Sequence, residues 1–113
     1  MSPITTHVLD TSLGRPGAGV GVTLQERDAA GAWKDIGSGT TNADGRITDL
    51  VASGSLRRGL HRLEFATGAY FGARGVDAFY PVVQIVFEVG DPAQHYHVPL
   101  LISPFGYSTY RGS

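Results

Sequence analysis

The sequence predicts an all-β domain, built as a sandwich or a barrel. Short segments of alternating apolar and polar residues recur along the 113-residue chain, and 16 glycines and 6 prolines are spread between them. Seven or eight such strands, with a turn signal every ~8–12 residues, are typical of these architectures. The one candidate helix, Tyr70–Phe79, is expected to be short because it contains Gly72 and Gly75 and precedes Pro81.

Three strands are expected in the first part of the chain. The segment 4–10 (ITTHVLD) is the first of them. Residues 20–25 (VGVTLQ) alternate apolar and polar side chains, which predicts a half-buried strand. Residues 27–33 contain Asp and Gly and predict a hairpin turn, so 33–39 is the expected return strand.

The second part of the chain begins with turn chemistry. Residues 41–46 (TNADGR) contain the pair Asp44-Gly45, which favours a tight turn. Three further alternating segments predict strands at 61–65, 83–89 and 95–102. In the last of these, the even-numbered side chains face one way and the odd-numbered ones, which include two histidines, face the other.

Composition limits the classes of function. A length of 113 residues, against a prior of about 150 per domain, predicts one domain spanning residues 1–113. A net charge of −1 argues against binding to nucleic acid or to acidic membranes. The absence of cysteine excludes disulfides, thiolate metal sites and thiol nucleophiles. No secretory signal is recognised at the N-terminus, so a cytoplasmic location is expected.

The four histidines are the most informative residues, because histidine titrates near neutral pH without help. His95 and His97 are two positions apart in a predicted strand and therefore share a face. His7 lies on the less apolar face of its strand, whereas His61 stands among apolar residues and is interpreted as structural or partly buried. Three interpretations remain open for His7, His95 and His97: histidines on a solvated surface, a weakly indicated zinc site, or activation of a hydrolytic water.

Two further features have both an ordinary and a functional interpretation. Arg46 ends the tight turn and is either an exposed arginine at the start of a strand or a guanidinium that grips a polar heterocycle. The C-terminal segment 107–113 (YSTYRGS) is rich in Tyr, Ser and Thr. An ordered end of this kind can present side chains, and its carboxylate, to a site.

Four segments carry a resemblance to a known family. They are 6–16 (THVLDTSLGRP), 41–47 (TNADGRI), 67–81 (TGAYFGARGVDAFYP) and 95–113 (HYHVPLLISPFGYSTYRGS). Together they resemble the transthyretin-like 5-hydroxyisourate hydrolases over essentially the whole chain. The terminal Tyr-Arg-Gly-Ser is specific, because it separates these hydrolases from transthyretin, the hormone carrier of the same fold. The sequence departs from the family pattern at Ile102 and Phe105, away from the residues implied in the chemistry.

The resemblance implies a fold, an assembly and a reaction. The fold would be a sandwich of two four-stranded sheets with one short helix. Four chains would form a homotetramer, a dimer of dimers, with a channel between the dimers. The reaction would open the ring of 5-hydroxyisourate to give 2-oxo-4-hydroxy-4-carboxy-5-ureidoimidazoline during urate degradation. No cofactor and no metal would take part.

The resemblance also implies a set of site residues. The expected catalytic residues are His7, Arg46 and His97, and the expected substrate-binding residues are His7, Arg46, Tyr110 and Ser113. The rival hypothesis is a transthyretin-like carrier that binds an aromatic small molecule in the same channel without turnover. A carrier would not need two histidines and an arginine to converge.

Overall fold

Two β-sheets and one helix make up the structure, a computed structural model that describes residues 2–113. The elements are β1 Ile4–Asp10, β2 Arg15–Pro16, β3 Gly21–Arg27, β4 Trp33–Thr40, β5 Arg46–Ile47, β6 Gly59–Phe65, α1 Thr67–Gly72, β7 Val83–Val89, β8 Tyr96–Ser103 and β9 Gly106–Thr109. Within residues 2–113, no helix is long and apolar enough to cross a membrane.

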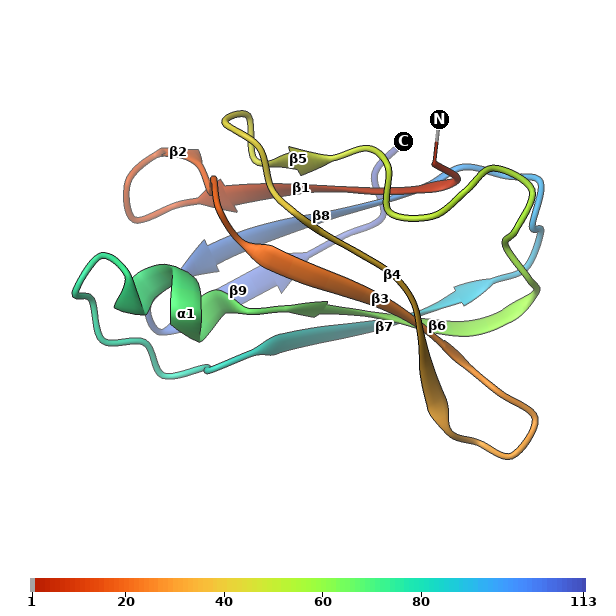
Figure 1. Cartoon of the computed structure of the whole chain (residues 1–113). Helices are drawn as coiled ribbons and strands as arrows, with labels where there is room; N and C mark the ends of the chain where they lie inside the picture. The colour runs from red at the N-terminus through yellow and green to blue at the C-terminus, as the bar shows by residue number, and fades with distance from the viewer. Residues whose placement is uncertain (1) are drawn as a thin grey trace.

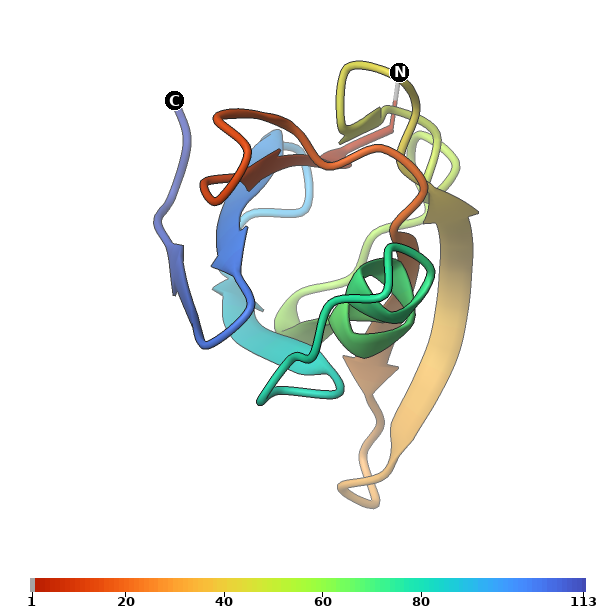
Figure 2. The same cartoon turned by 90° about the vertical axis from the view of Figure 1, so that its left-hand side faces the viewer.

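The two sheets face one another as the walls of a sandwich, with α1 at one end between them (Figures 1 and 2). One sheet has the order β4-β3-β6-β7, and the other has the order β2-β1-β8-β9 with β5 also paired to β1. The all-β sandwich with one short helix is therefore confirmed. The second sheet has five strands rather than the expected four, because the two-residue strands β2 and β5 pair with different parts of β1.

The predicted alternation of side chains is present in the core. Val20, Val22 and Leu24 are buried, and the even-numbered residues of β8 from Tyr96 to Ile102 are buried as well. His61 is 1% exposed and packs its ring against Phe87 with centroids 5.9 Å apart, which confirms its structural position.

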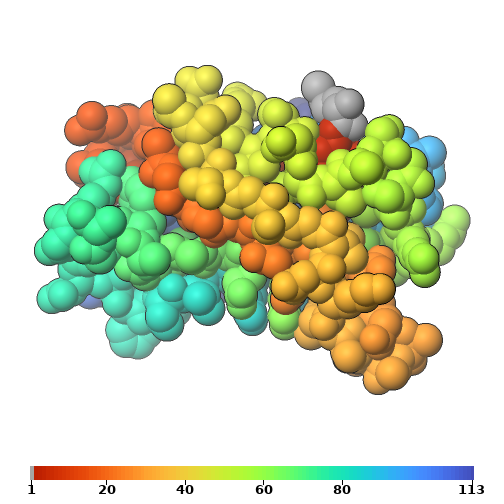
Figure 3. All heavy atoms as spheres, viewed as in Figure 1, coloured from red at the N-terminus to blue at the C-terminus, as the bar shows by residue number. Residues whose placement is uncertain are grey.

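The hairpin between β3 and β4 projects from the body of the molecule (Figure 3).

The helix begins and ends earlier than the sequence predicts. The expected range is Tyr70–Phe79, whereas α1 spans Thr67–Gly72. Gly75 adopts a φ of 70°, and the Val76 amide donates to the carbonyl of Phe71 at 3.0 Å. These are the features of a left-handed helix end, which glycine adopts without a Cβ penalty. The segment after Gly75 therefore leaves the helix several residues before Pro81.

The centre of the five-stranded sheet is a parallel pair of strands, β1 and β8. The register places Thr5 opposite His97 and His7 opposite Pro99. The end of β1 is fixed to the helix, since the hydroxyl of Tyr70 donates to Asp10 Oδ2 at 2.7 Å. Burial and Asp10 raise the pKa of Tyr70 to about 12, so the phenol keeps its proton and remains the donor. The end of β1, the strand that carries Thr5 and His7, is therefore anchored to α1.

Candidate active site

Three chain segments border the half-buried imidazole of His97. β1 lies beside it with Thr5 in register, and β5 pairs with β1 so that Arg46 is opposite His7. Directly opposed residues of an antiparallel pair point to the same face. On the other side, the C-terminal tail forms a bridge between His97 and Gly112. Residues from both ends and the middle of the sequence therefore meet on one face of the sheet.

The turn 41–46 positions Arg46. The side-chain oxygen of Asn42 accepts hydrogen bonds from the amides of Asp44 at 2.9 Å and Arg46 at 3.0 Å. Gly45 has a φ of 75°, and its carbonyl accepts a 2.7 Å hydrogen bond from the amide of Val8. A Cβ at Gly45 would come within 2.3 Å of the Val8 carbonyl oxygen. The predicted Asp-Gly turn is thus required by close backbone packing against β1.

The C-terminal tail is placed by β9 and by Gly112. β9 pairs with β8 as an antiparallel hairpin, in the register Ser103 to Gly106 and Leu100 to Thr109. Beyond it, the amide of Gly112 donates to the carbonyl of His97 at 2.9 Å. A Cβ at Gly112 would lie 2.5 Å from Cδ2 of His97. The glycine therefore allows the tail to lie directly against the imidazole.

A cavity of about 300 Å³, lined by residues with polar side chains, opens on this face. Its lining residues are Thr5, Thr6, Arg46, Thr48, His95, His97 and Ser113. Three of the residues that the sequence singles out, Arg46, His97 and Ser113, are therefore brought together. His7 is half-buried beside the cavity, opposite Arg46, but its side chain does not line it.

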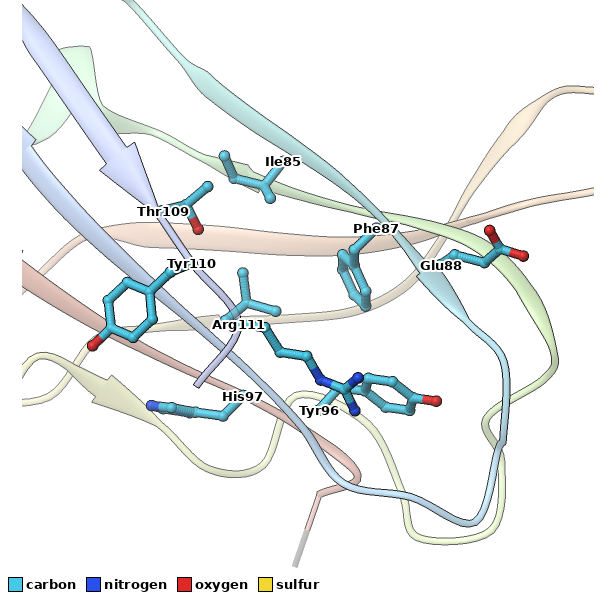
Figure 4. A pocket seen from close by; sticks show the side chains of 9 residues that line it. Ile85, Phe87, Glu88, Tyr96, His97, Thr109, Tyr110 and Arg111 are labelled. Carbon is cyan, nitrogen blue, oxygen red and sulfur yellow. The ribbon is translucent and has the colours of Figure 1, made fainter. Parts of the chain in front are cut away.

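Tyr110 lies in a neighbouring groove rather than in this cavity. The groove has a volume of about 330 Å³ and is formed between β7 and the C-terminal tail, with His97 at the boundary (Figure 4). Tyr110 is 60% exposed there. Arg111, which belongs to the terminal Tyr-Arg-Gly-Ser but has no predicted role of its own, lies with its guanidinium 4.9 Å from the centroid of the Tyr96 ring. It also donates to Gln94 Oε1 at 3.3 Å, so it holds the tail down.

The surroundings of His97 favour its neutral form. Burial is the largest cause that lowers the pKa of His97 below its ordinary value of 6.5, and the positive charges of Arg46, His7 and His95 act in the same direction. A hydrogen bond from the ring to the backbone of Thr5 acts in the opposite direction and raises the pKa. A neutral imidazole beside a fixed guanidinium can take a proton from water while the cation stabilises a developing oxyanion.

A zinc site is one of the interpretations that the sequence leaves open for the histidines. Among residues 2–113, no group of three or more His, Cys, Asp or Glu side chains is arranged to hold a metal ion. His95 and His97 are instead linked through Thr5, whose hydroxyl lies within hydrogen-bonding distance of both rings. Thr5 stands two positions before His7 in the strand expected at 4–10, so the two share a face, but no motif in the sequence gives Thr5 a role. That shared face was the signal that could have found it.

A model of the HIUase/Transthyretin family matches residues 4–112. The chain belongs to this family. A 5-hydroxyisourate hydrolase of Caulobacter vibrioides is 50% identical in an alignment of 118 positions that covers 100% of this chain and 100% of that protein. One of Mus musculus is 42% identical over 113 residues, covering 99% of this chain and 96% of the mouse protein.

Similar solved structures include both a hydrolase and a transthyretin with a bound ligand. The 5-hydroxyisourate hydrolase of Klebsiella pneumoniae is 39% identical with a TM-score of 0.84, covering 97% of this chain and 98% of that one. Sea bream transthyretin in complex with thyroxine is 34% identical with a TM-score of 0.93, covering 98% and 95%. The fold alone therefore does not decide between turnover and binding, and the side chains in the cavity must.

Proposed function

We propose that this protein hydrolyses 5-hydroxyisourate to 2-oxo-4-hydroxy-4-carboxy-5-ureidoimidazoline, without a cofactor or a metal. The observation that carries the proposal is the convergence of Arg46, His97 and Ser113 in one cavity, with His7 paired across from Arg46. The names of the full-length relatives, which are 5-hydroxyisourate hydrolases, support the same substrate. The cytoplasmic location remains part of the proposal.

Each residue has a role that follows from its chemistry. His97 is assigned as the general base because its lowered pKa keeps it neutral near pH 7. Arg46 binds the oxygens of the substrate and stabilises negative charge on the attacked carbonyl. His7, opposite Arg46, supports the transfer of a proton to the leaving nitrogen. Tyr110 and Ser113 are assigned to substrate binding, Ser113 at the cavity wall and Tyr110 from the adjoining groove.

The experiment follows the decay of freshly made 5-hydroxyisourate with and without protein. We expect the wild type to exceed the spontaneous rate, and His97→Ala and Arg46→Gln to lower kcat/KM by about 10²-fold or more. Arg57→Gln is the matched control, because Arg57 is exposed and lines neither the cavity nor the groove. A wild-type protein that leaves the spontaneous decay unchanged refutes the proposal.

The carrier is the second candidate, favoured by the overall similarity to thyroxine-bound sea bream transthyretin. It predicts tight binding of an aromatic ligand, no turnover, and no effect of His97→Ala on the binding constant. The cavity argues against it, since each of its lining residues carries a hydroxyl, imidazole or guanidinium group that can bind a polar heterocycle, and none is an aliphatic or aromatic hydrocarbon side chain.

The homotetramer is also a proposal. Two edge strands, β7 and β9, lie next to one another along the groove, and each can extend its sheet by pairing with a second copy. A dimer formed in this way leaves the cavity face free for the second dimer. Two such faces would then enclose the proposed channel.

A further inference from the structure

A single hydroxyl connects two imidazoles at the proposed active site. Thr5 Oγ1 lies 2.8 Å from Nδ1 of His97 and 3.0 Å from Nε2 of His95. Thr5 is 6% exposed, and the parallel register of β1 and β8 fixes it opposite His97. The two rings are stacked, with centroids 6.4 Å apart and an interplanar angle of 20°. The contact with His97 is built into the sheet, whereas His95 stands directly before β8, at the end of the loop that follows β7.

Two arrangements satisfy both contacts and also use the hydroxyl proton; a third, in which both rings donate to Thr5, leaves that proton without a partner among residues 2–113. A hydroxyl has one proton to donate, and each neutral imidazole has one donor nitrogen and one acceptor nitrogen. In the first arrangement, Nδ1–H of His97 donates to Thr5 and Thr5 donates to Nε2 of His95. In the second, Nε2–H of His95 donates to Thr5 and Thr5 donates to Nδ1 of His97. The position of the proton on His97 is therefore tied to that on His95.

The remaining nitrogen of His97 is the one available for chemistry. Nδ1 is held by Thr5, and the Cδ2 edge of the ring lies against Gly112. Nε2 is left to face the substrate. In the first arrangement Nε2 carries a lone pair and is a base, and in the second it carries a proton and is an acid.

We infer that Thr5 and His95 are positioning residues that switch His97 between base and acid by passing a proton between the buried ring and solvent. The inference rests on the proposed function and deepens it. His95 is the outer end of the chain of contacts because its side chain is exposed, and its Nδ1 is free to exchange a proton with water.

The proton balance of the proposed hydrolysis fits this relay. Nε2 of His97 takes a proton from the attacking water, whose oxygen bonds to the carbonyl carbon. Nδ1–H then passes to Thr5, the Thr5 proton passes to His95, and His95 releases one proton to solvent. The C–N bond breaks as Nε2–H of His97 protonates the leaving nitrogen, while Thr5 returns its proton to Nδ1 and His95 returns one to Thr5, so that the imidazole stays neutral. His95 takes one proton back from solvent, and the new carboxylic acid loses its own proton to water.

The charges around His97 make such a route useful. The groups that face it are Arg46 on β5, His7 on β1 and His95 beside it, and all three disfavour an imidazolium at this position. A proton taken by His97 is therefore held poorly there. Passing it to the exposed His95 moves the positive charge into water, where solvation is strong.

The first test measures the tautomer of His97 by ¹⁵N NMR on the resting protein near neutral pH. We expect Nδ1–H in the wild type and in Thr5→Ser, which keeps the hydroxyl. In Thr5→Val we expect a shift toward Nε2–H, the form that imidazole prefers in water. Nε2–H in the wild type, or Nδ1–H unchanged in Thr5→Val, overturns the inference. Neither result depends on turnover, so the proposed function is judged separately by wild-type activity.

The second test measures turnover in matched variants. We expect Thr5→Val and His95→Gln to lower kcat about 10- to 100-fold with little change in KM, less than the about 10²–10⁴-fold that a whole general base supplies. Added imidazole should restore His95→Gln, because it can carry the proton from the exposed side, but not Thr5→Val. Thr11→Val is the control, since it also removes a hydroxyl that bonds β8, at the Ile102 carbonyl. Full activity in His95→Gln, or no rescue by imidazole, overturns the inference.

Discussion

The imidazole of His97 stands half-buried among groups that carry or can carry positive charge. Burial first, and then Arg46, His7 and His95, lower its pKa below 6.5. Below its pKa the ring gains a proton and loses the lone pair that the base requires. A depressed pKa therefore extends the active range toward acid.

We predict a pH profile from this direction. The acidic limb of kcat/KM for 5-hydroxyisourate should have its midpoint below 6.5 in the wild type, because His97 there is harder to protonate than a free histidine. Arg46→Gln removes a positive charge, so its limb should move to higher pH in addition to the loss of rate. Arg57→Gln, with the charge removed elsewhere, should leave the limb in place. A wild-type midpoint at or above 6.5 contradicts the assignment of His97 as the base.

At the residue scale, sequence alone goes as far as the faces of strands. The spacing of His95 and His97 correctly predicts that they share a face, and the position of His7 predicts the same for Thr5. The hydrogen bonds between Thr5 and the two rings depend on the parallel register of β1 with β8, which joins residues about 90 positions apart. No local pattern encodes that register. The contact between Thr5 and the two histidines could therefore not be predicted from the sequence.

At the element scale, the C-terminal tail and β9 have separable tasks. β9 ends at Thr109 and is held to β8 by regular pairing, whereas the last four residues are attached through Gly112 and through Arg111 on Tyr96. The tail therefore contributes little to the sheet and much to the wall of the cavity. The competing interpretation is that it only shields an edge.

Removing Tyr110–Ser113 tests which interpretation holds. We expect turnover to fall by about 10²-fold or more, because Ser113 no longer lines the cavity and Gly112 no longer packs against His97. The oligomer and the melting temperature should be largely preserved. Ser113→Ala is the milder variant, since it keeps the terminal carboxylate and removes only the hydroxyl. A truncated chain that unfolds or dissociates would assign the tail a structural role and remove the support for Tyr110 and Ser113 as binding residues.

The bounds of the elements depend both on local sequence patterns and on tertiary packing, and the packing decides where the two disagree. The ranges of the strands that alternation predicts are right to within two residues, as in β8, predicted at 95–102 and found at Tyr96–Ser103. The helix is displaced because a contact outside it decides its start. The amide of Gly68 donates to the Pro81 carbonyl at 2.9 Å, and a Cβ there would come within 2.8 Å of that oxygen. Gly68 therefore docks α1 on the loop before β7, which propensity alone does not reveal.

At the scale of the whole molecule, two sheets end in free edges on the same side. β7 and β9 border one groove, and the apolar Val86 on β7 is 54% exposed. Aromatic side chains add to the apolar surface near β9, where the ring centroids of Tyr80 and Tyr107 are 5.3 Å apart. Exposed apolar surface beside unpaired strand edges is typical of protein–protein contacts. The proposed homotetramer would cover both features.

The assembly predicts the behaviour of a charge on β7. In a two-fold pairing of this edge, a lysine at Val86 is repeated in the partner, so the two positive charges repel one another across the new interface. Val86→Lys should therefore sediment as a smaller species than the wild type while keeping its β-sheet circular dichroism, because the side chain is outside the core. Val76→Lys, 39% exposed and beyond the end of α1, is the matched control and should keep the wild-type mass.

The same variant links assembly to turnover. A cavity that stays open on a single chain leaves Arg46 and His97 in contact with bulk water, which weakens the stabilisation of a developing oxyanion. A second dimer over this face would exclude that water. We therefore expect kcat of Val86→Lys to rise with protein concentration as the assembly reforms, whereas kcat of Val76→Lys should not change. Wild-type protein that sediments as a monomer at full activity would show that one chain suffices.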